Sequence, residues 1–176
     1  MTTVETLERA YQFNRDRTLA LITSLEALGD PAAALAWRPG PGRAHIGWQL
    51  THIAITEEIM ATERLNPEKP PQWTELWPRF RGGSTPDDNV PSLDEIRDLL
   101  AASRSRLLDT LRAYGDDRLQ EIPPAMAARK LTVLDVLHII AWHEGHHQGQ
   151  AHITLNLFKA AQQAAGRNSP VRGMLG

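Results

Sequence analysis

The stretch His143-Glu144-Gly145-His146-His147-Gln148-Gly149-Gln150 lies near the middle of the longest segment with helical apolar periodicity, which runs from about residue 132 to about residue 165. At roughly 100° per residue, His143, His147 and Gln150 share one face of this predicted helix. The same face carries large apolar side chains on both sides of the motif, namely Val136, Ile139, Ile140, Leu157 and Phe158. The pattern therefore predicts a buried stripe with two imidazoles, one turn apart, at its centre.

Two imidazoles on a buried stripe need partners, because an unsatisfied buried polar group costs roughly 1–3 kcal/mol. A divalent metal ion would take one nitrogen from each ring and leave the other nitrogen for a neighbouring acceptor. Core histidines satisfied by backbone or by water are the alternative, and this helix alone does not decide between the two. His138 and His152 fall on the opposite side, where we expect solvent, and His146 lies on the flank.

A third histidine lies on a second predicted helix, from about residue 44 to about residue 65. His52 shares a face of that helix with the apolar side chains Trp48, Ile55 and Ile59. Two histidines from one helix and one from another make a three-histidine site with an open position, which is the pattern of catalytic zinc. The predicted metal ligands are therefore His52, His143 and His147.

Three further ionisable residues lie near these ligands in the sequence. His45 is a weaker ligand candidate, because it falls in the first turn of its helix and we expect it near solvent. Glu63 shares the face of His52 further along, and we expect it to be exposed rather than a partner of a ligand. Glu144 lies about 100° from His143. We interpret it as a surface glutamate, with a proton carrier or a partner of a metal ligand as the alternatives.

Length and composition indicate one ordinary globular domain. The chain has 176 residues, of which 41% are hydrophobic and 23% charged, enough for a single core. We expect one domain over residues 1–165 and a tail over residues 166–176. The net charge of −2 argues against nucleic acid or an anionic membrane as the main partner. With no apolar run of 18 residues and no signal-peptide pattern at the start, we expect a cytoplasmic protein.

Four long helical segments predict an all-α four-helix bundle, a fold that commonly builds metal sites from facing side chains. They span about residues 4–28, 44–65, 92–114 and 132–165, with a loop over residues 30–43. A capping box at Ser92 and Glu95 opens the third helix, and Thr132 caps the fourth. A long loop over residues 68–91 joins the second and third helices. It carries four large apolar residues, so it is interpreted as a lid over the site or a cap on one end of the core: Trp73, Leu76, Trp77 and Phe80.

The letters His143-Glu144-Gly145-His146-His147 also satisfy H-E-x-x-H, the signature of zinc metalloproteases in which Glu is the general base. The usual third ligand is missing, because no Asp or Glu follows Glu144. The extended form of the motif would need Gly at position 150 and His at position 153, where this chain has Gln150 and Ile153. A metal-dependent hydrolase is therefore only a remote alternative.

Three stretches together resemble the DinB-like family of metalloenzymes. The first is Trp48–Ala54 around His52, followed by Glu57-Glu58, and the second is the segment Phe80–Leu99. The third is Trp142–Gln150, which is similar to the family motif H-x-x-x-H-x-G-Q. The resemblance covers about residues 5–160.

The resemblance implies a bundle in up-down-down-up order that forms homodimers. It also implies a divalent metal ion, Zn²⁺ or Ni²⁺, on His52, His143 and His147. Characterised members of the family are transferases or isomerases that use a low-molecular-weight thiol such as bacillithiol or mycothiol. The chain contains no cysteine, so any thiol chemistry here needs a thiol brought in from outside.

These observations lead to one functional hypothesis and one alternative from a different class. The hypothesis is a metal-dependent enzyme, in which a small thiol binds the ion as thiolate and attacks a small electrophilic substrate held near Trp48 and Gln150. The catalytic residues themselves are not identified by the sequence. The alternative is a non-catalytic protein whose ion only locks the bundle, with no cavity beside the metal.

Overall fold

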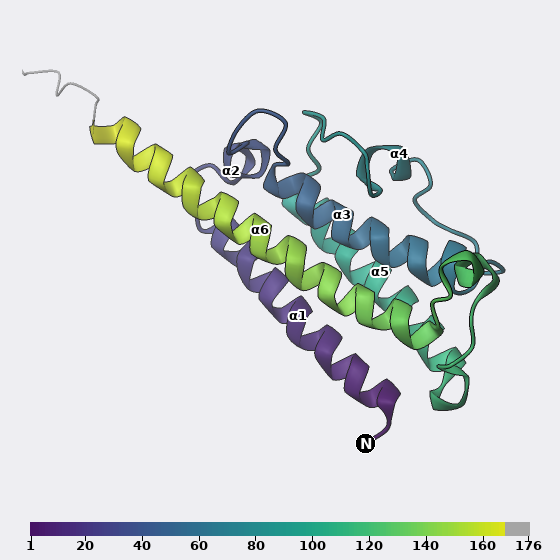
Figure 1. Cartoon of the computed structure of the whole chain (residues 1–176). Coiled ribbons are helices and arrows are strands. Elements are labelled where there is room, and N and C mark those ends of the chain that lie inside the picture. The colour runs from purple at the N-terminus through teal and green to yellow at the C-terminus, as the bar shows by residue number, and fades with distance from the viewer. Residues whose placement is uncertain (168–176) are drawn as a thin grey trace, which may run out of the picture.

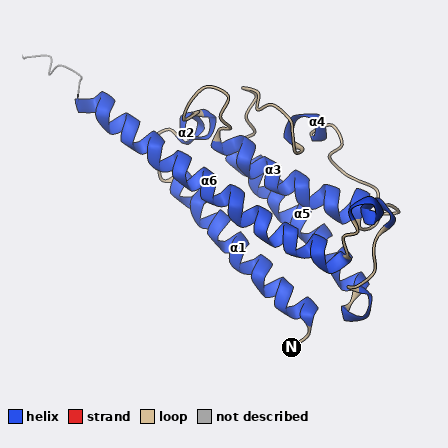
Figure 2. Ribbon diagram, viewed as in Figure 1, coloured by secondary structure: helices blue, strands red, loops and turns tan. Residues whose placement is uncertain are grey.

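Four long helices make up the body of the protein in the computed structural model, which describes residues 1–167 (Figure 1). They are α1 (Thr3–Glu26), α3 (Ile46–Ile59), α5 (Leu93–Tyr114) and α6 (Val133–Arg167). The connections hold two short α-helices, α2 (Pro31–Ala36) and α4 (Trp77–Phe80), and two 3₁₀ segments, Asp116–Arg118 and Pro124–Arg129. Every regular element in residues 1–167 is helical, which confirms the all-α class (Figure 2).

Local signals in the sequence set the ends of the long helices. Thr2 with Glu5 forms the capping box of α1, and the predicted box of Ser92 with Glu95 opens α5. The hydroxyl of Thr132 accepts the N–H of Asp135 at the start of α6, as predicted. Gly115, with φ of 61°, ends α5 in a conformation that favours glycine.

The predicted loop over residues 30–43 contains α2, which the prediction missed. Asp30 caps this helix by accepting the N–H of Ala33, and Pro31 fills its first position. Both are helix-start signals, but Gly40 and Gly42 in the same stretch favoured a loop reading. The packed side of α2 carries Ala34 and Leu35, which are buried in the core.

The helices pack as a bundle in which α1 and α3 each contact both α5 and α6. Hydrogen bonds show the directions of the helices. Tyr11 donates to the carbonyl of Leu137 and Asn14 to that of Ala141, so α1 and α6 run in the same direction. The pairs Thr110–Ala61 and Tyr114–Leu65 show the same for α5 and α3. The long segment that contains α4 connects α3 to α5. It runs back along α3, so that α5 begins at the same end of the bundle as α3 (Figure 1).

Helix α3 ends in a π-helical turn, Met60–Arg64, in which the N–H of Leu65 donates to the carbonyl of Met60 at 3.0 Å. An i→i+5 turn holds about one residue more than an α turn, so it sets the following side chains back by roughly 100°. Arg64 thereby takes the place on the face of His52 that Glu63 would hold in a regular helix. Glu63 pairs with Arg64 at 2.9 Å and its side chain is 35% exposed. It is therefore somewhat less exposed than predicted, and it is not a partner of a ligand histidine.

The predicted buried stripe of α6 is only partly buried. Val136, Ile140 and Phe158 lie in the core, but Ile139 is 39% exposed and Leu157 47% exposed. The reason is that α6 packs between α1 and α3 and leaves its third side open. His143 and His147 therefore lie at the border between the core and this open side. Within residues 1–167, no helix combines the length and the apolar character needed to cross a membrane.

Candidate metal centre

The three predicted ligands, His52, His143 and His147, converge in the structure and are called the histidine trio below. One ring nitrogen from each lies within 4.8 Å of the other two. The ring centroids are 4.4–4.8 Å apart. His52 is buried on α3, while the two histidines of α6 are half-buried. Helices α3 and α6 run in opposite directions, so His52 lies opposite His143 and Gln49 lies opposite His147. One turn of each helix is enough to bring the rings together.

Two hydrogen bonds fix the orientation of the trio. Nδ1 of His52 lies 2.5 Å from the carbonyl oxygen of Phe80, and Nδ1 of His147 lies 2.5 Å from Oε1 of Gln49. Both oxygens can only accept, so both Nδ1 atoms carry the proton and both Nε2 atoms are left with a bare lone pair. Nε2 of His143 lies 3.0 Å from Nε2 of His52. Because Nε2 of His52 can only accept, Nε2 of His143 donates in this contact, and a metal ion between the two rings would use the other neutral tautomer of His143.

The rings are neutral at neutral pH. Burial lowers the pKa of His143 and of His147 to about 3, and the neighbouring imidazoles add to the effect. Burial also lowers the pKa of His52, although its bond to the carbonyl of Phe80 opposes the shift. A metal ion binding here would therefore not have to displace imidazolium protons.

The spacing of the His52–His143 pair fits two ligands of one divalent metal ion, and His147 lies within 4.8 Å of both. Two imidazole nitrogens on a zinc ion at 2.0–2.1 Å stand about 3.0–3.4 Å apart, and the His52–His143 pair is at 3.0 Å. The acceptors on Nδ1 of His52 and of His147 are the partners that metal-bound imidazoles normally have. Trp48 stacks on the His52 ring, with centroids 4.5 Å apart, and closes one side of the site.

A family model described as the DinB superfamily matches residues 10–151, most of the chain and all three histidines. The chain belongs to the DinB superfamily. The match confirms the resemblance carried by the two histidine segments. No curated protein and no solved structure matches the chain.

Two cavities flank the trio of this DinB-superfamily protein. One, of about 290 Å³, is lined by His52 and His143 themselves, and we call it the arginine cavity because Arg64 and Arg81 also line it. The other, of about 440 Å³, is lined by both predicted substrate-pocket residues, Trp48 and Gln150, and we call it the tryptophan cavity. None of the three histidines lines it, but two of its lining residues contact them: Trp48 stacks on the ring of His52, and Gln49 bonds His147.

The long segment between α3 and α5 packs against the site. Phe80 is buried and gives its carbonyl to His52, and the indole N–H of Trp48 donates to the carbonyl of Arg79 at 3.0 Å. Glu58 anchors the segment, since its buried carboxylate accepts the N–H groups of Gln72 and Trp73 and the indole N–H of Trp77. The segment thus forms one wall of the candidate metal centre, which agrees with the predicted lid more closely than with a cap on the end of the core.

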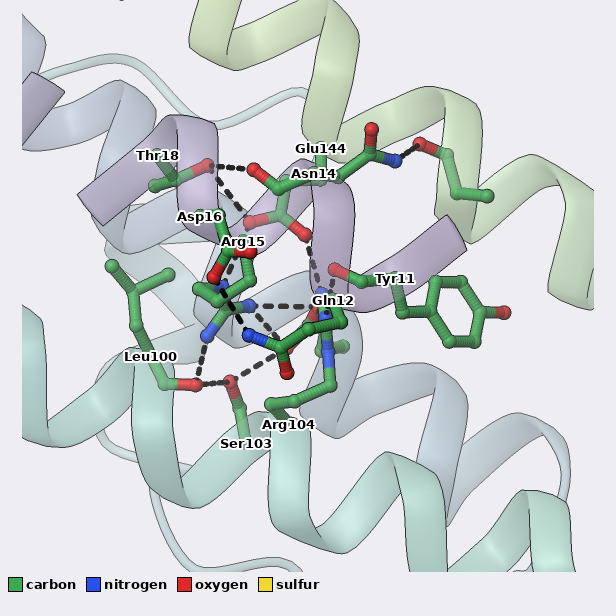
Figure 3. Close-up of polar contacts among 12 residues, drawn as sticks. Tyr11, Gln12, Asn14, Arg15, Asp16, Thr18, Leu100, Ser103, Arg104 and Glu144 are labelled. Carbon is green, nitrogen blue, oxygen red and sulfur yellow. Dashed lines mark hydrogen bonds and ion pairs between the residues drawn. The ribbon is translucent and has the colours of Figure 1, made fainter. Parts of the chain in front are cut away.

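The interpretation of Glu144 as a surface residue was wrong. Glu144 is 1% exposed and lies in the centre of the bundle (Figure 3). Oε1 accepts from Arg15 and from the hydroxyl of Thr18, both at 2.8 Å, and Oε2 accepts from Arg104. With both oxygens held by cationic and hydroxyl donors, the carboxylate is not placed as the general base of an H-E-x-x-H hydrolase. The interpretation failed because the wheel showed only that Glu144 points away from His143, not that α1 and α5 lie there.

Glu144 belongs to an ion cluster that takes one charged residue from each long helix: Arg15, Glu57, Arg104 and Glu144. Both guanidiniums bind both carboxylates, so the cluster is neutral overall. Burial alone would raise the pKa of Glu57, but Arg15 and Arg104 outweigh it and hold that pKa below its usual value. Sequence reasoning missed these residues, although Arg15 and Arg104 each interrupt an apolar stripe of their helix.

Two other histidines near the candidate site, His45 and His146, have other roles. His45 is 1% exposed rather than solvated, and its Nδ1 caps α3 by accepting the N–H of Trp48 at 3.0 Å. Its Nε2 lies 2.8 Å from the carbonyl of Asp87, so both ring nitrogens are used and the residue is not a ligand. His146 is exposed, and its ring lies 2.8 Å from the amide of Gln150. Gln49, the partner of His147, was also missed, although it lies one turn before His52 on the same helix.

Proposed function

We propose that this protein is a metal-dependent enzyme that holds one divalent ion, zinc or nickel, on the histidine trio. The observation that carries the proposal is the convergence of three neutral imidazoles, two of which have Nδ1 bonded to an acceptor and Nε2 free. When bound to three neutral ligands, such an ion keeps open positions and ionises a thiol or a water molecule. The parallel helix pairs also support the up-down-down-up bundle that the family resemblance implies.

We infer a thiol-dependent transfer to a small electrophile as the reaction class. The chain has no cysteine, so the nucleophilic sulfur belongs to a low-molecular-weight thiol. The chain's own residues supply position rather than acid or base. His52 and His143 face the arginine cavity, and the tryptophan cavity offers an apolar wall from Trp48 and an amide from Gln150.

A purely structural metal is the alternative, and two observations argue against it. The four long helices are already joined by the ion cluster and by apolar clusters at both ends of the bundle. The ion is therefore not needed to close the core. A purely structural role for the ion also does not explain why cavities lie on two sides of the site.

The deciding experiment measures metal and thiol binding on protein purified without nickel-affinity resin. We expect about one metal ion per chain, and single replacements of His52, His143 or His147 by alanine to remove it while His138→Ala, on the solvent side, retains it. In the cobalt-loaded protein a low-molecular-weight thiol should produce a sulfur-to-metal charge-transfer band. Metal retained in a variant that lacks all three histidines would overturn the site. A metal-loaded protein whose spectrum no thiol changes would favour the structural alternative.

We further propose that the protein is a cytoplasmic homodimer that pairs through the open side of α6. Four exposed apolar side chains fall within about 60° of one another on that helix: Ile139, Trp142, Ile153 and Leu157. Trp142→Asp should convert a dimer to a monomer in light scattering, whereas His152→Asp, on a different face of α6, should not. A monomeric unmodified chain would contradict the proposal.

A further inference from the structure

The arginine cavity carries a charge pattern that the metal site alone does not explain. Its walls hold His52, His143, Thr56, Met60, Arg64 and Arg81, and none of its lining residues is an Asp or Glu. Three neutral imidazoles leave the double positive charge of a bound ion uncompensated. The two guanidiniums add to that charge instead of balancing it, so the cavity is built to attract an anion.

Both arginines reach the cavity through local features of the backbone. The π turn at the end of α3 sets Arg64 on the face of His52, as described above. Arg81 directly follows Phe80, whose carbonyl accepts from Nδ1 of His52. The hydrogen bond that orients the histidine therefore also fixes the backbone from which Arg81 extends. π turns occur frequently at functional sites.

The guanidiniums of Arg64 and Arg81 differ in whether a carboxylate already balances their charge. Arg64 pairs with Glu63 at 2.9 Å. No ion pair joins Arg81 to a carboxylate anywhere in residues 1–167, and its side chain is exposed. The protein side of the cavity thus carries one uncompensated positive charge, that of Arg81, which one carboxylate group of a ligand can pair.

We propose that the arginine cavity binds the carboxylate of a small anionic substrate, with Arg81 as the main anchor and Arg64 as the second. The inference rests on the proposed metal site, because another atom of the same molecule is to reach the open positions of the ion. The size of the cavity limits the ligand. Its volume of about 290 Å³ corresponds to roughly ten water molecules, at the lower limit for ligand pockets. The part of the substrate that the cavity holds is therefore a short carboxylic acid segment of about ten heavy atoms.

The test uses succinate as the probe and succinamide as its neutral counterpart, titrated by calorimetry into zinc-loaded and metal-free protein. Succinate should bind at least tenfold more tightly than succinamide. Arg81→Gln should weaken succinate binding about five- to tenfold, the effect of losing one charge-assisted contact at an exposed site. Arg64→Gln should weaken it about twofold, since Glu63 already offsets that charge. Arg43→Gln is the matched control, because Arg43 is an exposed arginine that lines the tryptophan cavity.

Metal analysis of the same samples separates failure of this inference from failure of the proposed function. The inference is overturned if Arg81→Gln binds succinate like the unmodified protein, if Arg43→Gln weakens binding as much as Arg81→Gln does, or if succinamide binds as tightly as succinate. If the protein binds no zinc, the proposed function fails. In that case the anion site is supported only if metal-free protein binds succinate and if Arg81→Gln weakens this binding while Arg43→Gln does not. Any other result overturns the anion site as well.

Discussion

Replacing Glu144 by glutamine should destabilise the whole bundle rather than remove a catalytic base. The buried carboxylate accepts from Arg15, Thr18 and Arg104. Glutamine keeps the shape but loses the charge, and its amide N–H₂ is turned toward a donor. Breaking a buried ion pair from one side costs about 3–5 kcal/mol. In a domain of this length about 1 kcal/mol corresponds to 2–4 °C in Tm, so we expect Tm to fall by about 6–20 °C.

The matched control is Glu26→Gln, which makes the same chemical change in an exposed pair. Glu26 binds the guanidinium of Arg97 at 2.7 Å, with both side chains a third or more exposed, and such pairs contribute about 1 kcal/mol at most. Both variants are followed by thermal and urea unfolding without metal. Folded Glu144→Gln should still bind metal like the unmodified chain. A Tm within about 2 °C of the unmodified protein, or metal lost from the folded variant, would refute the assignment of Glu144 to the ion cluster.

Three further outcomes are expected. Gln49→Ala should weaken metal binding about 10- to 100-fold in competition with a chelator, because it frees Nδ1 of His147; an unchanged affinity would show that the bond is incidental. The pKa of His143 and of His147 is about 3 when folded, against an ordinary value of 6.5. The unfolded chain therefore binds more protons between these values, and the Tm of metal-free protein should fall as the pH drops from about 6.5 toward 3, less steeply after His143→Ala. Gly47→Ala should destabilise by about 1–3 kcal/mol, although alanine is the better helix former, because the new Cβ would lie 2.3 Å from Cγ1 of Val90. Val90→Ala in the same chain should restore the Tm.

The sequence predicted the helices and the histidine trio because both depend on local periodicity. Apolar spacing and caps such as Ser92 and Thr132 fix where a helix begins. His52 and His143 could be paired because each interrupts an apolar stripe, and a polar residue in that position needs a partner. The all-α class followed from the same periodicity, whereas the family followed from the resemblance of three sequence stretches to the DinB-like family. The short helix α2 was not, since glycines and prolines around it also favour a loop.

What the sequence did not reveal depends on contacts between distant segments. The acceptor of His52 is the carbonyl of Phe80, a backbone atom that no side-chain pattern marks. The position of Glu144 depended on which helices pack beside α6, and the wheel of one helix does not contain that information. The π turn that brings Arg64 to the arginine cavity likewise follows from packing rather than from a motif.

The acidic residues near the trio explain why the proposed ligand set is purely imidazole. Three glutamates lie close to the ligands in sequence, and each is buried and bound elsewhere. Glu57 and Glu144 are held by the two guanidiniums of the ion cluster, and Glu58 by N–H groups of the segment around α4. If one of these carboxylates ligated the ion, it would cancel part of the positive charge at the site. By holding all three away from the trio, the fold leaves that charge for a ligand, and the same distribution makes the arginine cavity a site for an anion.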